Sequence, residues 1–168
     1  MINIQYYQTP VGELILGSYD NQLCMADWRY RKMRESIDAR LQKGLKAEYI
    51  QEYTPILEEA VKQLDEYFNR ERKTFDVPLL MVGTDFQKQV WQGLIDIPHG
   101  TTCSYLELSK RIGNEKAVRA VASANGANAI SIMIPCHRII GSDGSLTGYA
   151  GGLPAKKKLL QLEQALLV

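Results

Sequence analysis

The run Ile134-Pro135-Cys136-His137-Arg138 places a thiol, an imidazole and a guanidinium on consecutive residues. A free thiol titrates near ~8.5, and an adjacent base or cation raises its small thiolate fraction at neutral pH. The run therefore indicates a nucleophilic cysteine. The alternative is a buried structural cysteine, because apolar residues 132–134 precede it. Adjacent side chains of a strand also point to opposite faces, so the pair needs support from the rest of the chain.

Metal and disulfide chemistry have few candidate residues. The cysteines are Cys24, Cys103 and Cys136, and the histidines are His99 and His137. An odd number of widely spaced cysteines argues against a disulfide framework. Without a CxxC pair, a structural zinc site has too few ligands. We therefore expect no metal and no cofactor.

The cysteine run resembles the active-site motif of the O6-alkylguanine-DNA alkyltransferases, the methylated-DNA–protein-cysteine methyltransferases, in their bacterial stand-alone form. The resemblance is strong over residues 84–163 and weaker over residues 9–12. It also rests on the runs Phe86-Gln87-Lys88-Gln89-Val90-Trp91, Ile97-Pro98-His99-Gly100, Ala117-Val118-Arg119-Ala120-Val121 and Gly148-Tyr149-Ala150-Gly151-Gly152. Two residues depart from it: Lys158 stands where relatives often carry Trp, and Leu162 where they often carry His.

The resemblance implies DNA repair by direct, irreversible alkyl transfer to Cys136, one group per protein molecule. The substrate would be O6-alkylguanine in DNA, with O4-alkylthymine as a further substrate. His137 would remove the thiol proton through a water, and Glu163 would orient His137. Asn128 would link a helix-turn-helix to the cysteine segment. Tyr105 would hydrogen-bond the extruded guanine and protonate its leaving position.

The resemblance also implies which residues contact DNA. Arg119 would enter the duplex and take the place of the flipped base, and Tyr149 in segment 148–152 would close over that base. The other expected substrate or DNA contacts are Ala150, Arg138, Ala120, Ser123 and Gly126. The expected partner is double-stranded DNA, bound in the minor groove with base flipping by a monomer. Cooperative assembly on DNA stays open.

The patterning that must position these residues predicts an α/β fold in two domains. Residues 1–82 form a small sheet-plus-helix domain, which we expect to be structural. Residues 83–168 form a mainly helical domain with a helix-turn-helix, which we expect to carry DNA binding and alkyl transfer. Pro78 and Gly83 mark the boundary between the two.

In the first domain, apolar runs separated by turn residues predict short strands over residues 2–27. A charged helix is expected over residues 29–43, and residues 44–53 are ambiguous. Thr54 and Pro55 then open a helix as N-cap and first residue.

In the second domain, capping boxes predict two helix starts. They pair Thr84 with Gln87 and Ser104 with Glu107. The helix opened by Ser104 should run to about residue 112, and a Gly113 turn with Asn114 as cap should open a helix over residues 115–125. A last helix should start at Pro154, with Leu159, Leu162 and Leu166 on one face.

Charge and hydropathy set weaker limits. Net charge is +1, but residues 87–168 carry 9 Lys/Arg against 5 Asp/Glu, a balance compatible with phosphate contacts. No apolar run approaches the ~20 residues that span a bilayer, and the N-terminal residues have no signal-peptide pattern. We expect a cytoplasmic protein with no membrane partner.

Two other functions stay open at this point. A helix-turn-helix regulator or lesion sensor without chemistry would use the same helix pair but leave the cysteine run unexplained. A cysteine hydrolase would need a histidine separated from the cysteine and an oxyanion hole, and the only other histidine lies in a Pro-His-Gly turn.

Overall fold

The chain divides into two compact units, Met1–Gly83 and Thr84–Val168. The computed structural model describes residues 1–165. The first unit contains a sheet and helices, and the second is helical, so the predicted α/β class is confirmed. The predicted boundary lies after residue 82.

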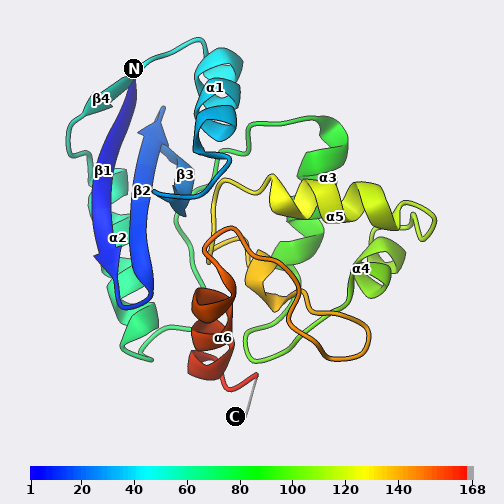
Figure 1. The fold of residues 1–168 in the computed structure, drawn as a ribbon. Helices are drawn as coiled ribbons and strands as arrows, with labels where there is room; N and C mark the ends of the chain where they lie inside the picture. Colours follow the sequence, from blue (N-terminus) through cyan, green and yellow to red (C-terminus); the bar gives the residue numbers. More distant parts are fainter. Residues whose placement is uncertain (166–168) are drawn as a thin grey trace. The chain divides into compact units, whose positions relative to one another are not determined.

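The first unit is built on a four-stranded sheet in the order β3-β2-β1-β4 (Figure 1). Its strands are β1 (Ile2–Thr9), β2 (Gly12–Tyr19), β3 (Gln22–Trp28) and β4 (Tyr49–Gln51). The first three strands form antiparallel hairpins, and β4 pairs in parallel with β1. At the second hairpin, Asp20 and Asn21 have φ of 51° and 59°. Positive φ at both central residues matches the twist of the flanking strands.

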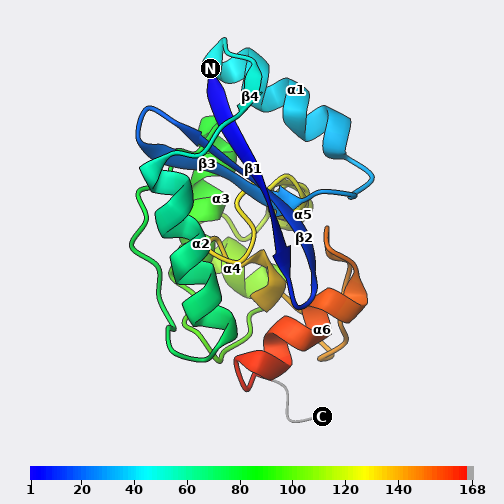
Figure 2. The same ribbon diagram turned by 90° about the vertical axis from the view of Figure 1, so that its left-hand side faces the viewer.

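Two helices accompany this sheet. Helix α2 (Pro55–Phe68) packs along one face, against β1, β2 and β3 (Figure 2). The predicted N-cap is confirmed, because the Thr54 side chain accepts a hydrogen bond from the backbone N–H of Leu57 at 3.3 Å. Helix α1 (Arg34–Leu45) begins later than predicted, and β4 occupies part of the segment that the sequence left ambiguous.

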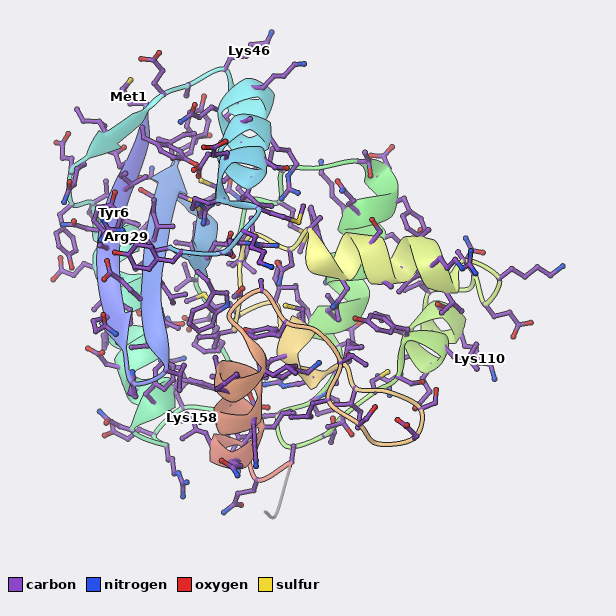
Figure 3. All side chains as sticks on the ribbon, viewed as in Figure 1. Met1, Tyr6, Arg29, Lys46, Lys110 and Lys158 are labelled. Carbon is purple, nitrogen blue, oxygen red and sulfur yellow. The ribbon has the colours of Figure 1, made fainter. Side chains whose placement is uncertain are left out.

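Charged side chains connect β3 to the start of α1. The fully buried Asp27 carboxylate accepts hydrogen bonds from Arg31 and Arg34, at 3.1 Å and 3.0 Å. Two guanidinium partners supply the compensation that a buried carboxylate requires. On the surface, the Arg29 guanidinium lies 3.8 Å from the centre of the Tyr6 ring (Figure 3).

The second unit contains helices and one short 3-10 turn. They are α3 (Asp85–Ile95), α4 (Tyr105–Arg111), α5 (Val118–Gly126), η1 (Cys136–Arg138) and α6 (Leu153–Leu162). Both predicted capping boxes are present, with reciprocal hydrogen bonds between each cap residue and its glutamine or glutamate. The buried Trp91 indole donates to the carbonyl of Ala124 at 2.8 Å and so fixes α5 against α3.

Helices α4 and α5 form the predicted helix-turn-helix, but α5 begins later than predicted. Gly113 takes the positive φ of 78° that the turn after α4 requires. Asn114 is not the cap of α5, so that prediction is wrong. Its carbonyl accepts the N–H of Ala117 at 3.1 Å and closes an extra turn. The first bond of α5 then runs from Val121 N–H to the Ala117 carbonyl at 2.8 Å.

Helix α6 has a buried face that differs from the predicted one. Its buried residues are Ala155, Lys156, Leu159 and Leu160, and Glu163 just beyond the helix is also buried. Leu162 is only half-buried, and Leu166 lies outside the described residues. Among residues 1–165, no helix has the length and apolar character needed to cross a membrane.

Candidate active site

The backbone before Cys136 is held in a tight, strained path. Ile132 is buried and has φ of 71°, and Met133 N–H donates to the Ser131 carbonyl at 2.8 Å. This is a γ-turn of the positive-φ kind, which is costly for a β-branched residue. Cys136 N–H makes a second short-range bond to the Ile134 carbonyl, also at 2.8 Å. Such strain persists only where the surroundings hold it in place.

Asn128 provides that hold. Its Oδ1 accepts the N–H of Ile130 at 2.9 Å, which fixes the orientation of the amide. Its Nδ2 donates to the Ile134 carbonyl at 2.9 Å and lies 3.3 Å from Cys136 Sγ. The amide therefore bridges the end of α5 to the cysteine segment and also presents an N–H to the sulfur.

Cys136, His137 and Arg138 form the 3-10 turn η1. Adjacent residues of a strand face opposite ways, but this segment is a 3-10 turn and not a strand. All three side chains are buried. The sequence pattern indicated a nucleophilic cysteine, and the turn buries the thiol, the imidazole and the guanidinium in one environment.

Glu163 is the centre of a buried charge network. Its carboxylate accepts two hydrogen bonds from the Arg138 guanidinium, from Nε at 2.8 Å and from Nη2 at 3.0 Å. His137 Nε2 lies 2.7 Å from Glu163 Oε2. Arg138 Nη1 also donates to the Ile97 carbonyl at 2.6 Å. The bidentate geometry compensates the buried carboxylate.

The network determines which ring nitrogen of His137 carries the proton. Burial alone would raise the pKa of Glu163, but hydrogen bonds from His137 and Arg138 outweigh burial and hold that pKa well below its usual range. An ionised carboxylate only accepts, so His137 Nε2 must donate. Burial lowers the pKa of His137, which Glu163 only partly offsets. The neutral ring therefore leaves Nδ1 as an acceptor, and this buried atom has no hydrogen-bond partner among the described residues.

A buried cation that the sequence motifs did not identify also acts on the thiol. Lys156 is 1% exposed, and its charge interacts with Cys136. The signal was present in the sequence: Lys156 and Glu163 share helical spacing with Leu159 and Leu160, so both charges fall on the apolar face of α6.

The expected substrate-facing residues occupy different positions. The Tyr149 ring lies edge-on to the His137 ring, with centroids 6.4 Å apart. Ala150 follows it and is half-buried. Tyr105 is the half-buried first residue of α4, and no described contact joins its hydroxyl to the cysteine segment. The backbone of Cys103 pairs with Ile139, which keeps the start of α4 beside η1.

The expected DNA contacts of α5 share one exposed face. Arg119, Ala120, Ser123 and Gly126 are all exposed and recur at helical spacing. A Cβ added at Gly126 would meet no atom within 4 Å. The face thus offers one long cation beside small side chains. Lys110, at the end of α4, extends outward from the same helix-turn-helix (Figure 3).

Comparisons with known proteins agree with this arrangement. Residues 85–165 match the sequence model of the 6-O-methylguanine DNA methyltransferase DNA binding domain, and residues 2–81 match that of its ribonuclease-like domain. The chain belongs to the 6-O-methylguanine DNA methyltransferase family. This confirms the resemblance drawn from the cysteine motif.

Individual members of the family are similar over nearly the whole chain. The methylated-DNA–protein-cysteine methyltransferase of Methanosarcina barkeri is 43% identical over 94% of each chain. The constitutive Bacillus subtilis protein of that name is 41% identical over 96% of each chain. The crystal structure of Mycobacterium tuberculosis O6-methylguanine methyltransferase superimposes with a TM-score of 0.83 at 38% identity, covering 98% of this chain and 94% of that one. The same organism's OGT in complex with DNA gives 0.84 at 38% identity, covering 97% and 93%.

Arg138 is the member of the expected set whose surroundings differ most from the expectation. The resemblance implies that Arg138 contacts substrate or DNA. The structure buries its guanidinium against Glu163 and the Ile97 carbonyl. These contacts make it a support for the carboxylate. Among residues 1–165, no group of three or more His, Cys, Asp or Glu side chains could hold a metal ion.

The buried neutral His137 predicts a pH-dependent stability. An unfolded histidine binds a proton below about 6.5, whereas burial lowers the pKa of His137 in the folded state. The unfolded state then binds more protons, so the free energy of unfolding should fall as the pH drops below that value, by at most about 1.4 kcal/mol per pH unit. Urea unfolding at pH 5, 6 and 7 measures this slope.

The two histidines provide the matched comparison. His137→Gln should flatten the slope, because the group that titrates on unfolding is gone. His99→Gln, in a half-buried turn, should keep it. An unchanged slope in His137→Gln would mean that another group carries the pH dependence.

Proposed function

We propose that this chain repairs DNA by moving an alkyl group from O6 of guanine onto Cys136. One observation carries the proposal: His137 is hydrogen-bonded to Glu163 on one ring nitrogen, while its other nitrogen is a buried acceptor one residue from the thiol. Family membership and full-length similarity to proteins named methylated-DNA–protein-cysteine methyltransferases support alkyl transfer as the reaction. O4-alkylthymine is a further substrate of the same site.

In the first step, the Cys136 thiol gives its proton to His137 Nδ1 through a water. The Asn128 N–H and the Lys156 charge favour the thiolate that remains. Ionised Glu163 stabilises the imidazolium as it forms, and Arg138 keeps Glu163 in place.

In the second step, the sulfur attacks the alkyl carbon. The S–C bond forms as the C–O6 bond breaks, and guanine leaves with the bonding electron pair. Tyr105 supplies a proton to the leaving base, and the proton taken up by His137 returns through solvent to the tyrosinate. The product is a thioether, which no group in the site can hydrolyse, so each molecule reacts once. The protein is a methylated-DNA–protein-cysteine S-methyltransferase that inactivates itself.

The second unit binds DNA and performs the chemistry, and the first unit has a structural role. The O6 atom is stacked and paired inside a duplex, so the base must be turned out at a cost of a few kcal/mol. The small side chains of Ala120, Ser123 and Gly126 allow close approach to the minor groove, and Arg119 fills the gap left by the base. Tyr149 and Ala150 close over the extruded base.

We also infer the setting in which the protein acts. A reactive free thiol fits a reducing compartment, which favours the cytoplasm. The monomer contains every residue of the proposed site, and several monomers assembling along DNA would leave that site unchanged.

The proposed reaction predicts a stoichiometric covalent adduct. After reaction with a duplex carrying O6-methylguanine, the intact protein should gain one methyl group, and peptide mass spectrometry should place it on Cys136. Lesions repaired should never exceed the protein added. Cys136→Ala should bind the duplex with normal affinity and gain no mass.

Two results would contradict the proposal. Binding without any gain in mass would indicate a regulator or lesion sensor. Repair of several lesions per molecule would exclude a permanent acceptor.

Arg119 predicts a difference between two substrates. Arg119→Ala should slow repair of a duplex by about tenfold or more, because part of the unstacking cost is no longer offset. Its slow reaction with the free alkylated base should stay within twofold of wild type. Rapid-quench kinetics measures both. Equal losses on both substrates would place Arg119 in the chemistry or the fold, and no loss on either would remove it from DNA binding.

A further inference from the structure

Lys156 is a buried ammonium that the proposed chemistry does not use for proton transfer. It is 1% exposed, whereas the next two residues of α6, Lys157 and Lys158, are exposed (Lys158 is labelled in Figure 3). Burying a lysine is costly unless its charge is hydrogen-bonded and compensated. Its position therefore calls for a physical reason that its exposed neighbours do not share.

Lys156 is hydrogen-bonded to the segment just before Tyr149. Lys156 Nζ donates to the Thr147 carbonyl at 3.2 Å and to Thr147 Oγ1 at 3.3 Å. Thr147 lies two residues before Tyr149, whose ring packs edge-on to His137. One charged group thus fixes both the backbone and the side chain of this segment to α6.

The Lys156 ammonium stays mostly charged near neutral pH. Burial lowers the pKa of Lys156 to about 8, and Cys136 acts in the opposite direction. Lys156 in turn helps to lower the pKa of His137. A charged donor makes stronger hydrogen bonds than a neutral one, so the ammonium strengthens the link to Thr147.

We propose that Lys156 is a positioning residue for alkyl transfer, whose ammonium holds Thr147 and thereby sets the segment that carries Tyr149 and Ala150. The inference rests on the proposed transfer to Cys136. In this role Lys156 acts through Thr147. Its effect on the rate can be large, because misplacement of a substrate-covering segment by about 1 Å can lower a rate strongly. Loss of the link should slow transfer at saturating DNA and leave DNA affinity nearly unchanged.

The first test compares neighbouring lysines on α6. Lys156→Met keeps an unbranched side chain of nearly the same length and removes its charge, and Lys157→Met is the matched control on the exposed face. Lys156→Met should lower the saturating transfer rate by about tenfold, with DNA affinity within twofold. Hydrogen exchange should accelerate in residues 145–150. The control should match wild type in all three measurements.

The second test asks whether Lys156 acts through Thr147. Thr147→Val removes the hydroxyl acceptor but keeps the carbonyl, so the rate should fall by about threefold, and Thr147→Ser should restore it. In the Lys156→Met background, Thr147→Val should cause no further loss, because residues that act as one unit are not additive. The Thr147 pair decides the matter even if Lys156→Met fails to fold.

The outcomes separate this inference from the proposed function. If wild type and Lys157→Met transfer the group while Lys156→Met transfers it equally fast, the positioning role is overturned and the function stands. Equal rates for Thr147→Val and Thr147→Ser, or additive losses in the double variant, overturn it as well. If wild type transfers nothing to Cys136, the proposed function itself has failed.

Discussion

The rest of the site depends on the hydrogen bonds that the buried carboxylate of Glu163 accepts. This carboxylate accepts two hydrogen bonds from Arg138 and one from His137, and Arg138 also donates to the Ile97 carbonyl. This network connects the end of α6, the turn η1 and the residues after α3. An unpaired carboxylate at this position would cost several kcal/mol. The same compensation that makes the burial tolerable also fixes the tautomer of His137, so stability and reactivity share one cause.

The cysteine segment depends on a second, uncharged element. Asn128 uses both ends of its amide to hold residues 130–134 and places an N–H 3.3 Å from Cys136 Sγ. It lies just after α5, whose opposite face exposes Arg119 and small side chains. In the proposed function, the helix that binds DNA and the segment that receives the alkyl group are therefore joined by one side chain. The hydrogen bonds of Asn128 on either side of Ile132 maintain the γ-turn there.

Local sequence patterns predicted the helix starts, because neighbouring residues alone determine them. Thr54, Thr84 and Ser104 cap the helices that their types and spacing indicated. Asn114 failed as a cap because an extra turn, closed through its own carbonyl, precedes α5. The burial of Arg138 and the contacts of Lys156 depend on partners that are distant in the sequence, which periodicity does not identify. The resemblance named the reacting residues, but the neutral tautomer of His137 follows only from the geometry.

Ionised Glu163 makes His137 able to accept the thiol proton, and Glu163→Gln removes the charge responsible. The amide oxygen can replace Oε2 and keep the tautomer of His137, but the negative charge that stabilises the imidazolium is lost. The measurement is the single-turnover rate of methyl transfer to Cys136 at pH 7 with saturating DNA. We expect the rate to fall by about tenfold or more with DNA affinity unchanged. A wild-type rate in a folded Glu163→Gln protein would contradict this role of Glu163.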